Sequence, residues 1–470
     1  MKKTATLWQQ QAYVLPTIST SFIVGSLTIV QGMYAKYFGL SLETIAAIIF
    51  ISRLFDAVTD PIIGFYSDRN YRRTSSRKLF VVVGGLLFIV SSYFLYTPVE
   101  LETLHAIENG DVETTDYISA EYFLGWYLVF YFSWTLFEIP HLAWGRELSS
   151  TSQGSMKIYS LRAASMWLGI LLFYSVPLFP FFETQAFTPK TLYWAVLGAS
   201  FLMLPFLYLC IKNTPDNVCS NVELDHSNPK EPLNLTAIGQ EVLVNKPLLI
   251  ILTVIMLFNF SVSGMWLTLL FIFSDTYLLL GERFAQLSLI GLSAGIPMMV
   301  VWCWLARYWS KKMALVLGLL LSLIGTLGTG LLNPGETSFF PLALVLIVCF
   351  GMGSPAVNCL APSILADIID YGSWKFGRSN GATYFSLYTL LGKAAAGIGG
   401  AVGFVIAGFY GFDPSSLTQS EESIFGLRMA IAWLPAGMVL LAVFFLLRYP
   451  FSAQHHSIIR RRLEGIKLRS

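Results

Sequence analysis

Long apolar runs separated by short polar segments follow one another along the whole chain. A transmembrane helix needs about 20 predominantly apolar residues, and about twelve runs satisfy that rule. The runs cover residues 16–38, 42–66, 79–97, 122–144, 160–182, 191–211, 247–273, 284–305, 313–332, 338–365, 381–410 and 426–449. This pattern predicts an all-α membrane protein, with the longest runs tilted or extended by interfacial turns.

One long polar stretch divides the runs into two groups. Residues 212–246 contain prolines, asparagines and mixed charges, which indicate a linker and not a span. We expect a six-helix half at 1–211, a cytoplasmic linker at 212–246, a second six-helix half at 247–450 and a basic cytoplasmic tail at 451–470. Two halves joined in this way are the plan of many secondary transporters.

The composition agrees with a membrane protein. Of the 470 residues, 55% are hydrophobic and 12% are charged, whereas a soluble domain carries about 25% charged residues. The five cysteines are scattered without metal or redox spacing, so we interpret them as small apolar residues. The first apolar run lacks a signal-peptide cleavage site, and we expect it to be a retained span.

Charge asymmetry predicts the orientation. Lys and Arg cluster in segments 67–78, 306–312 and 451–470, and alternating the spans places these segments on one side with the N-terminus. Segment 98–121 falls on the opposite side and contains acids but no Lys or Arg. Because basic loops stay in the cytoplasm, we expect both termini there. The basic tail should contact membrane lipids and not nucleic acid.

Charged side chains inside the second run form the first candidate site. Asp56 and Asp60 are four residues apart and share one helix face, with Arg53 on the same side one turn earlier. A charge at bilayer depth costs about 2.5–3.5 kcal/mol, so such groups usually line a polar cavity on an ion or substrate pathway. The alternative is a structural Arg53–Asp56 ion pair that locks two helices and leaves Asp60 unexplained.

Other polar groups at similar depth extend this chemistry. Thr135 and Glu138 lie in the fourth run, Arg162 in the fifth and Lys393 in the eleventh. Carboxylate and hydroxyl oxygens suit hard cations such as Na⁺, but a desolvated carboxylate can instead carry a proton. The two bases can donate to substrate hydroxyls or to the acids, which would couple ion binding to substrate binding.

Aromatic and small polar residues offer further contacts. Trp144, Trp167 and Trp266 are the best aromatic candidates for substrate contact, because polar or small residues surround them. His141 either relays a proton or is hydrogen-bonded within the bundle, and we favour the hydrogen bond. Polar residues of the second half that either contact substrate or join helices are Asn259, Ser261, Ser263 and Asn358.

Several motifs together resemble a known transporter family. Gly64-x-x-x-Asp68-Arg69-x-x-Arg72-Arg73 resembles the loop motif of the major facilitator superfamily, with Tyr71 where that motif usually has a second glycine. Four further blocks resemble the glycoside–pentoside–hexuronide:cation symporters, the melibiose-permease family. They are Arg53-x-x-Asp56-x-x-x-Asp60-Pro61, Glu138-Ile139-Pro140, Ala366-Asp367-Ile368-Ile369-Asp370-Tyr371-Gly372, and Lys393 in an Ala/Gly-rich run.

The resemblance implies the major facilitator fold and a secondary transporter that moves a sugar or glycoside with Na⁺, Li⁺ or H⁺. By motif matching, Asp56 and Asp60 would hold the coupling cation, as metal ligands if it is Na⁺, and Thr135 would contribute oxygen. Glu138 stands where family members have a sugar-binding aspartate, and Arg162 would hold sugar hydroxyls.

The same resemblance extends the expected substrate site. Lys393 would bridge the cation and substrate sites. Thr20 stands, beside Ser21, where melibiose-permease-like members carry an acid. We therefore place Thr20 at the expected substrate site together with Trp144 and Trp167.

The motifs also imply gating residues on the cytoplasmic side. The loop motif supplies Gly64, Asp68, Arg69, Arg72 and Arg73. Asp367 and Asp370 belong to a segment, 367–378, that is expected to form an ion-pair latch between the halves in one conformation, with a plain solvated loop as the alternative. Beyond the coupling cation no cofactor is expected, and we expect a monomer in a bacterial inner membrane.

Three other functions are alternatives to sugar symport. Eukaryotic lysolipid transporters share the implied fold, so a carrier of lysolipids or other amphiphiles is the alternative within transport. A membrane enzyme acting on lipid-linked substrates would need a motif such as H-E-x-x-H, which the sequence lacks, or G-x-S-x-G at a strand-to-helix turn. Gly291-Leu292-Ser293-Ala294-Gly295 has the G-x-S-x-G spacing but lies inside an apolar run and not at such a turn. A sensor or scaffold would usually add a soluble output domain.

Overall fold

The computed structural model describes residues 5–100, 103, 118–149, 152–216, 242–335, 338–376, 381–416 and 418–450. Contacts divide the chain into two compact units, Met1–Asn228 and Pro229–Ser470. This division falls within the expected linker. Most of that linker, residues 217–241, and the expected tail, 451–470, lie outside the described residues, so their boundaries stay predictions.

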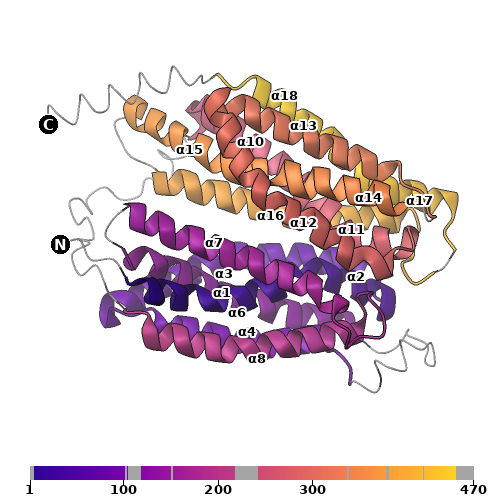
Figure 1. Cartoon of the computed structure of the whole chain (residues 1–470), viewed down its shortest axis with the longest axis horizontal. Helices are drawn as coiled ribbons and strands as arrows, with labels where there is room; N and C mark the ends of the chain where they lie inside the picture. The colour runs from indigo at the N-terminus through magenta and orange to yellow at the C-terminus, as the bar shows by residue number, and fades with distance from the viewer. Residues whose placement is uncertain are drawn as a thin grey trace. The chain divides into compact units, whose positions relative to one another are not determined.

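The first unit is a bundle of long helices that run alongside one another (Figure 1). The helices are α1 (Leu7–Gly25), α2 (Leu27–Tyr37), α3 (Leu42–Thr74), α4 (Lys78–Tyr96), α6 (Ala120–Glu147), α7 (Ser152–Ser175), the 3-10 turn η2 (Val176–Leu178) and α8 (Pro189–Asn213). α1 and α2 together form one span. α1 packs on α7 and α8, and both α3 and α4 pack on α6, so the helices with candidate site residues are neighbours.

The second unit also consists of long helices, but several are interrupted by π-helical turns. They are α10 (Lys246–Phe258), η3 (Asn259–Trp266), α11 (Leu267–Ile272), η4 (Phe273–Tyr277), α12 (Gly281–Tyr308), α13 (Lys311–Gly330), α14 (Phe339–Leu346), η6 (Ile347–Gly353), α15 (Ser354–Phe376), α16 (Gly381–Phe409), α17 (Glu421–Arg428), η7 (Met429–Trp433) and α18 (Leu434–Leu447). The segments η3, η4, η6 and η7 are π-helical, whereas the described part of the first unit contains no π-helix.

The helices account for the expected membrane spans. Within the described residues, 10 helical spans are long and apolar enough to cross a membrane. The two further long helices are α3 and α6, which carry the candidate acids and are less apolar for that reason. The expected all-α fold of two six-helix halves is therefore confirmed.

Small residues allow two close helix contacts. A Cβ at Gly169 of α7 would lie 2.3 Å from the Ile18 carbonyl oxygen of α1, and a Cβ at Gly399 of α16 would lie 2.1 Å from the Phe260 carbonyl oxygen of η3. No larger side chain fits at either crossing, so glycine fixes how closely these helices approach.

The structure corrects two expected boundaries. The first span begins at Leu7 and not at residue 16, because Thr6 forms a capping box with Gln9 and starts the helix early. The helix of the second span, α3, continues through the expected loop motif to Thr74 and is capped by Ser75, whose φ of 54° is left-handed. Tyr71, in place of a glycine, lets the helix run on, so the motif residues from Gly64 onward lie on a helix.

Candidate functional site

The charged residues of α3 form an ion pair that also contacts α6. Arg53 Nη1 lies 3.1 Å from Asp56 Oδ2, and the two side chains are 15% and 16% exposed. The Arg53 guanidinium lies 4.1 Å from the ring centre of Tyr131 on α6. The ion pair considered as the structural alternative is therefore present. It lies within one helix, and the connection to a second helix comes from the tyrosine ring.

Arg53 lies at the end of a row of buried polar and aromatic side chains. Gln31 Nε2 of α2 donates to the Tyr127 hydroxyl at 2.7 Å, and the rings of Tyr127 and Tyr131 have centres 5.0 Å apart. All three side chains are buried. Sequence reasoning missed this row of side chains, although the two tyrosines are four residues apart and therefore share one helix face.

Asp60 and Thr135 lie close to the Arg53–Asp56 pair along their own helices. Asp60 is half-buried one turn beyond Asp56 on α3, and Thr135 is buried one turn beyond Tyr131 on α6. Because α3 packs on α6, carboxylate and hydroxyl oxygens are available on two neighbouring helices. Their role as cation ligands stays a prediction.

The expected substrate residues Glu138 and Arg162 are in direct contact. Arg162 Nη2 of α7 donates to Glu138 Oε1 of α6 in a short, charge-assisted hydrogen bond. The Arg162 side chain is 9% exposed and the Glu138 side chain 22% exposed. The structure thus places one acid and one base together between the fourth and fifth spans, as the sequence pattern proposed.

His141 is hydrogen-bonded within the bundle. Its Nε2 lies 2.9 Å from the Tyr13 carbonyl oxygen, the Tyr13 hydroxyl donates to the His141 carbonyl oxygen at 2.7 Å, and the two rings stack with centres 4.3 Å apart. His141 is fully buried. This arrangement agrees with the hydrogen-bonded interpretation and joins α1 to α6.

The other residues expected to contact substrate differ in their burial and hydrogen bonds. Trp144 is fully buried and its Nε1 donates to the Pro215 carbonyl oxygen at 3.0 Å, so its contact with substrate stays a prediction. Trp266 is likewise buried and bonded to Thr329. Thr20 is buried and donates to the Thr17 carbonyl oxygen at 3.2 Å within its own helix, whereas Trp167 is half-buried on α7.

The small polar residues proposed for the second half bond locally where hydrogen bonds are described. Asn259 Nδ2 donates to the Ile255 carbonyl oxygen at 2.9 Å, and Ser261 Oγ donates to the Leu257 carbonyl oxygen at 2.7 Å. Both bonds fall within one turn of the same span, so these two residues satisfy the helix backbone.

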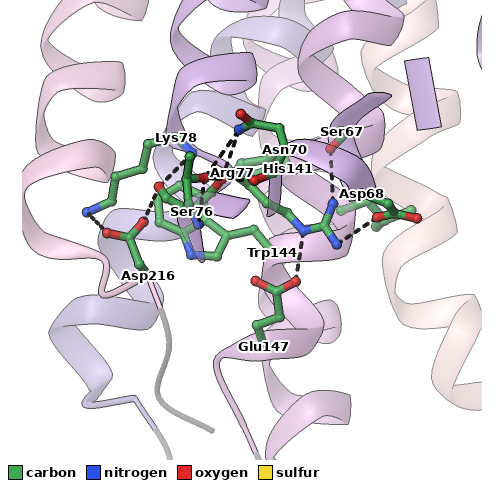
Figure 2. A network of polar contacts seen from close by, with 12 residues as sticks. Ser67, Asp68, Asn70, Ser76, Arg77, Lys78, His141, Trp144, Glu147 and Asp216 are labelled. Atoms are coloured by element: carbon green, nitrogen blue, oxygen red, sulfur yellow. Dashed lines mark hydrogen bonds and ion pairs between the residues drawn. The ribbon is translucent and has the colours of Figure 1, made fainter. Parts of the chain in front are cut away.

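The expected gating motif contributes to a charged network around Arg77 at one end of the first unit (Figure 2). Arg77 donates to Glu147 at 2.8 Å, to Asp68 at 2.9 Å and to Ser67 at 3.0 Å. Burial alone lowers the pKa of Arg77, but the two carboxylates outweigh it and hold the pKa above its usual value. Sequence reasoning missed Arg77 and Glu147 as a pair, because 70 residues separate them.

The same end of the unit fixes the start of the segment that follows α8. Ser76 Oγ donates to Asp216 Oδ1 at 2.6 Å, and Lys78 Nζ lies 3.2 Å from Asp216 Oδ2 (Figure 2). With the Trp144–Pro215 bond, these contacts attach residues 215 and 216 to the bundle. Arg69 and Arg73 of the motif are exposed.

The acids of the expected latch lie on α15. Lys311 Nζ lies 2.7 Å from both carboxylate oxygens of Asp367. Both residues belong to the second unit, so this ion pair is not a contact between halves, and a latch at Asp367 in another conformation stays a prediction. Asp370 lies one turn further on α15. Lys393 is exposed on α16, and its link to the cation site stays a prediction.

Comparison with known proteins assigns the chain to a family. The family described as MFS/sugar transport protein matches residues 13–453. The chain belongs to this family. An MFS/sugar transport protein is a membrane transporter, so the chain is an integral membrane protein and not an enzyme, and the resemblance to the glycoside–pentoside–hexuronide:cation symporters is confirmed.

Individual relatives of this MFS/sugar transport protein are carriers. The uncharacterised symporter YjmB of Bacillus subtilis (strain 168) is 25% identical, over 90% of this chain and 88% of that protein. The glucuronide carrier protein homolog of Escherichia coli (strain K12) is 24% identical, over 92% and 89% of the two chains. The sodium-dependent lysophosphatidylcholine symporter 1 of Gallus gallus is 22% identical, over 89% and 82%.

A solved structure supports the fold of the MFS/sugar transport protein. A mutant of the nucleoside transporter NupG matches with a TM-score of 0.65 and 11% sequence identity, covering 94% of this chain and 100% of that one. At this identity the likeness shows the fold alone.

Proposed function

We propose that this transporter is a cation-coupled symporter that carries a sugar or glycoside by alternating access. The observation that supports it most is that neighbouring helices of one unit hold two charged pairs, Arg53–Asp56 on α3 and Glu138–Arg162 between α6 and α7. Charges in membrane helices are costly and usually mark substrate or ion pathways. A symporter needs one ion site and one substrate site, and each of the two charged pairs is a candidate for one of them.

Glu138 and Arg162 suit hydroxyl-rich substrates. A carboxylate accepts hydrogen bonds from sugar hydroxyls, and a guanidinium donates to hydroxyl or carboxylate oxygens. Without substrate the two groups satisfy each other. A bound sugar would take over part of these bonds, so the empty site avoids a buried unpaired charge.

Asp56, Asp60 and Thr135 are the proposed cation ligands. Their oxygens suit Na⁺ or Li⁺, and either carboxylate could carry a proton instead. Arg53 already contacts Asp56, so an arriving cation would compete with the guanidinium for this carboxylate. Lys393 of the second unit is proposed to connect ion and substrate binding.

Uptake into vesicles containing the purified full chain tests this proposal. Labelled glucuronides and neutral glycosides would be offered with an inward Na⁺ gradient, with an inward H⁺ gradient, or with neither. We expect one of the gradients to concentrate at least one sugar inside the vesicles. Equal internal and external sugar concentrations under every gradient would refute cation coupling.

A lysolipid carrier is the second candidate, favoured by the lysophosphatidylcholine symporter among the relatives. The two functions separate in the same vesicles. If lysophosphatidylcholine is taken up with the ion gradient and no sugar competes with it, the substrate class is the lysolipid one.

We further propose a bacterial inner membrane location, a monomer and cytoplasmic termini. Arg73 is exposed at the end of α3, and the Glu183 side chain, in the connection between α7 and α8, is 89% exposed. In a cysteine-free background, an impermeant thiol reagent outside the cell should label Glu183→Cys and not Arg73→Cys. The opposite pattern would reverse the orientation.

A further inference from the structure

An apolar pocket of about 360 Å³ lies on the first unit, apart from both charged pairs. Its walls come from α1, from the end of α7 with η2, and from the start of α8, and include Phe22, Leu172 and Ala195. Leu172 follows Arg162 by ten residues, which is about 15 Å along a helix. The pocket is therefore distinct from the proposed substrate site.

The lining of this pocket suits an apolar ligand. Small-molecule sites have volumes of about 300–1,000 Å³ and mostly apolar walls with a few polar groups. Here the walls are mainly aromatic and aliphatic. Ser19 adds a polar atom, because its hydroxyl is buried with no hydrogen-bond partner among the described residues.

The surroundings of the pocket indicate a lipid as the source of the ligand. Phe179 and Trp194 at its edge are 57% and 39% exposed, and Phe201, about two turns further along α8, is 76% exposed. On a transmembrane bundle such a surface meets acyl chains. Trp194 marks the interface region, and Lys190, one turn before it, lies 3.7 Å from Glu183 in the connection between α7 and α8.

We propose that this pocket binds the apolar chain of a membrane lipid or of a single-chain amphiphile. The chain would fill the space between α1, α7 and α8, and the Ser19 hydroxyl would donate to an ester or hydroxyl oxygen of the ligand. The site is independent of the proposed symport, because it uses neither charged pair.

Two glycines provide a matched test. Gly198 lines the pocket and Gly437 lies on α18, and a Cβ at either position would meet nothing within 4 Å. Gly198→Trp should therefore fill the pocket without a clash, and Gly437→Trp adds the same ring elsewhere. Gly198→Leu and Gly437→Leu repeat the comparison with a smaller side chain, in case the tryptophan prevents folding.

Native mass spectrometry of the delipidated full-length protein would measure binding of phosphatidylglycerol and of palmitoyl-lysophosphatidylcholine. We expect the first bound molecule to bind about tenfold more weakly to Gly198→Trp, because apolar burial is lost, and equally well to Gly437→Trp and the unmodified protein. An effect on phosphatidylglycerol alone identifies a bilayer lipid, and an effect on the lysolipid alone identifies a free amphiphile. Equal binding by all variants would overturn the proposal, whatever the transport assays show.

Discussion

The guanidinium of Arg53 stacks on the ring of Tyr131, 4.1 Å from its centre, while the same side chain contacts Asp56. Arg53 is thus held by a carboxylate on its own helix and by an aromatic face on α6. The ring offers the guanidinium a favourable contact that does not depend on the carboxylate. A cation that displaces Arg53 from Asp56 would leave the arginine on the tyrosine.

We predict that the aromatic face of Tyr131 stabilises Arg53. Tyr131→Leu should lower the free energy of unfolding by about 1–2 kcal/mol, since a desolvated cation–π contact contributes about 2 kcal/mol. Tyr131→Phe keeps the ring and should remain near the parent protein in thermal melting in detergent. Equal losses in both variants would assign the effect to the hydroxyl.

A second prediction concerns Asp56. Asp56→Asn leaves Arg53 buried without its carboxylate, and breaking a buried pair costs about 3–5 kcal/mol. We expect little folded protein on size-exclusion chromatography. Adding Arg53→Met to Asp56→Asn should recover folding, because the uncompensated charge is gone. If the double variant folds no better than Asp56→Asn, the loss has another cause.

Asp60 should separate coupling from folding. We expect Asp60→Asn to insert, fold and still exchange substrate down its gradient, while losing ion-stimulated uptake, because an amide binds a cation poorly and exchanges no proton. Uphill uptake and exchange would be compared in the same vesicles. Undiminished ion dependence would place the cation site elsewhere.

The fold was predictable because it depends on the length and spacing of apolar runs. Helix ends were less predictable, because polar residues continue α3 to Thr74 beyond the apolar stretch. The contact between Glu138 and Arg162 agrees with the expectation of one acid and one base at depth between the fourth and fifth spans. The full burial of Trp144 was not expected, because a tryptophan among polar neighbours in sequence can be fully buried in space.

Partners far apart in sequence explain the remaining misses. The Arg77–Glu147 contact and the Gln31–Tyr127 contact each join helices separated by many residues. Taken alone, Arg77 and Glu147 are common charges at helix ends, and Gln31 and Tyr127 are a polar and an aromatic residue within apolar runs. Only the packing of α4 on α6 and the contact of α2 with α6 show that they meet, and no spacing rule within one run contains that information.

Substrate affinity should depend on the pair between α6 and α7. Glu138→Gln and Arg162→Ala should each weaken sugar binding by about tenfold or more, since a hydrogen bond to a charged group contributes about 1.5–3 kcal/mol. Because either change also breaks the pair and destabilises the fold, binding is measured on protein that elutes as a folded species on size-exclusion chromatography. Cation binding should survive in both, because Asp56 and Asp60 are unchanged. Isothermal titration of sugar and of Na⁺ would measure both affinities. Unchanged sugar affinity in both variants would show that the substrate site lies elsewhere.

Arg77 should stabilise the first unit across the neutral pH range. Arg77→Ala should cost about 2–3 kcal/mol, because two charge-assisted hydrogen bonds are lost, whereas the exposed Arg73→Ala should be nearly neutral. A raised pKa means that this stabilisation is complete below the unfolded-state pKa of Arg77 and is lost only as pH rises through the folded-state value. Melting between about pH 6 and pH 9 should therefore show a constant difference between Arg77→Ala and Arg73→Ala.

The π-helical turns of the second unit give the two halves different mechanical character. A π-turn takes one extra residue per hydrogen bond, so the side chains beyond it are rotated relative to a continuous α-helix. In the described spans that contain η3, η4, η6 and η7, the regular α-helical hydrogen bonding is therefore already interrupted. We expect bending strain in the second unit to concentrate at these turns, whereas in the first unit it should concentrate at Pro61 of α3 and Pro140 of α6, next to the charged pairs.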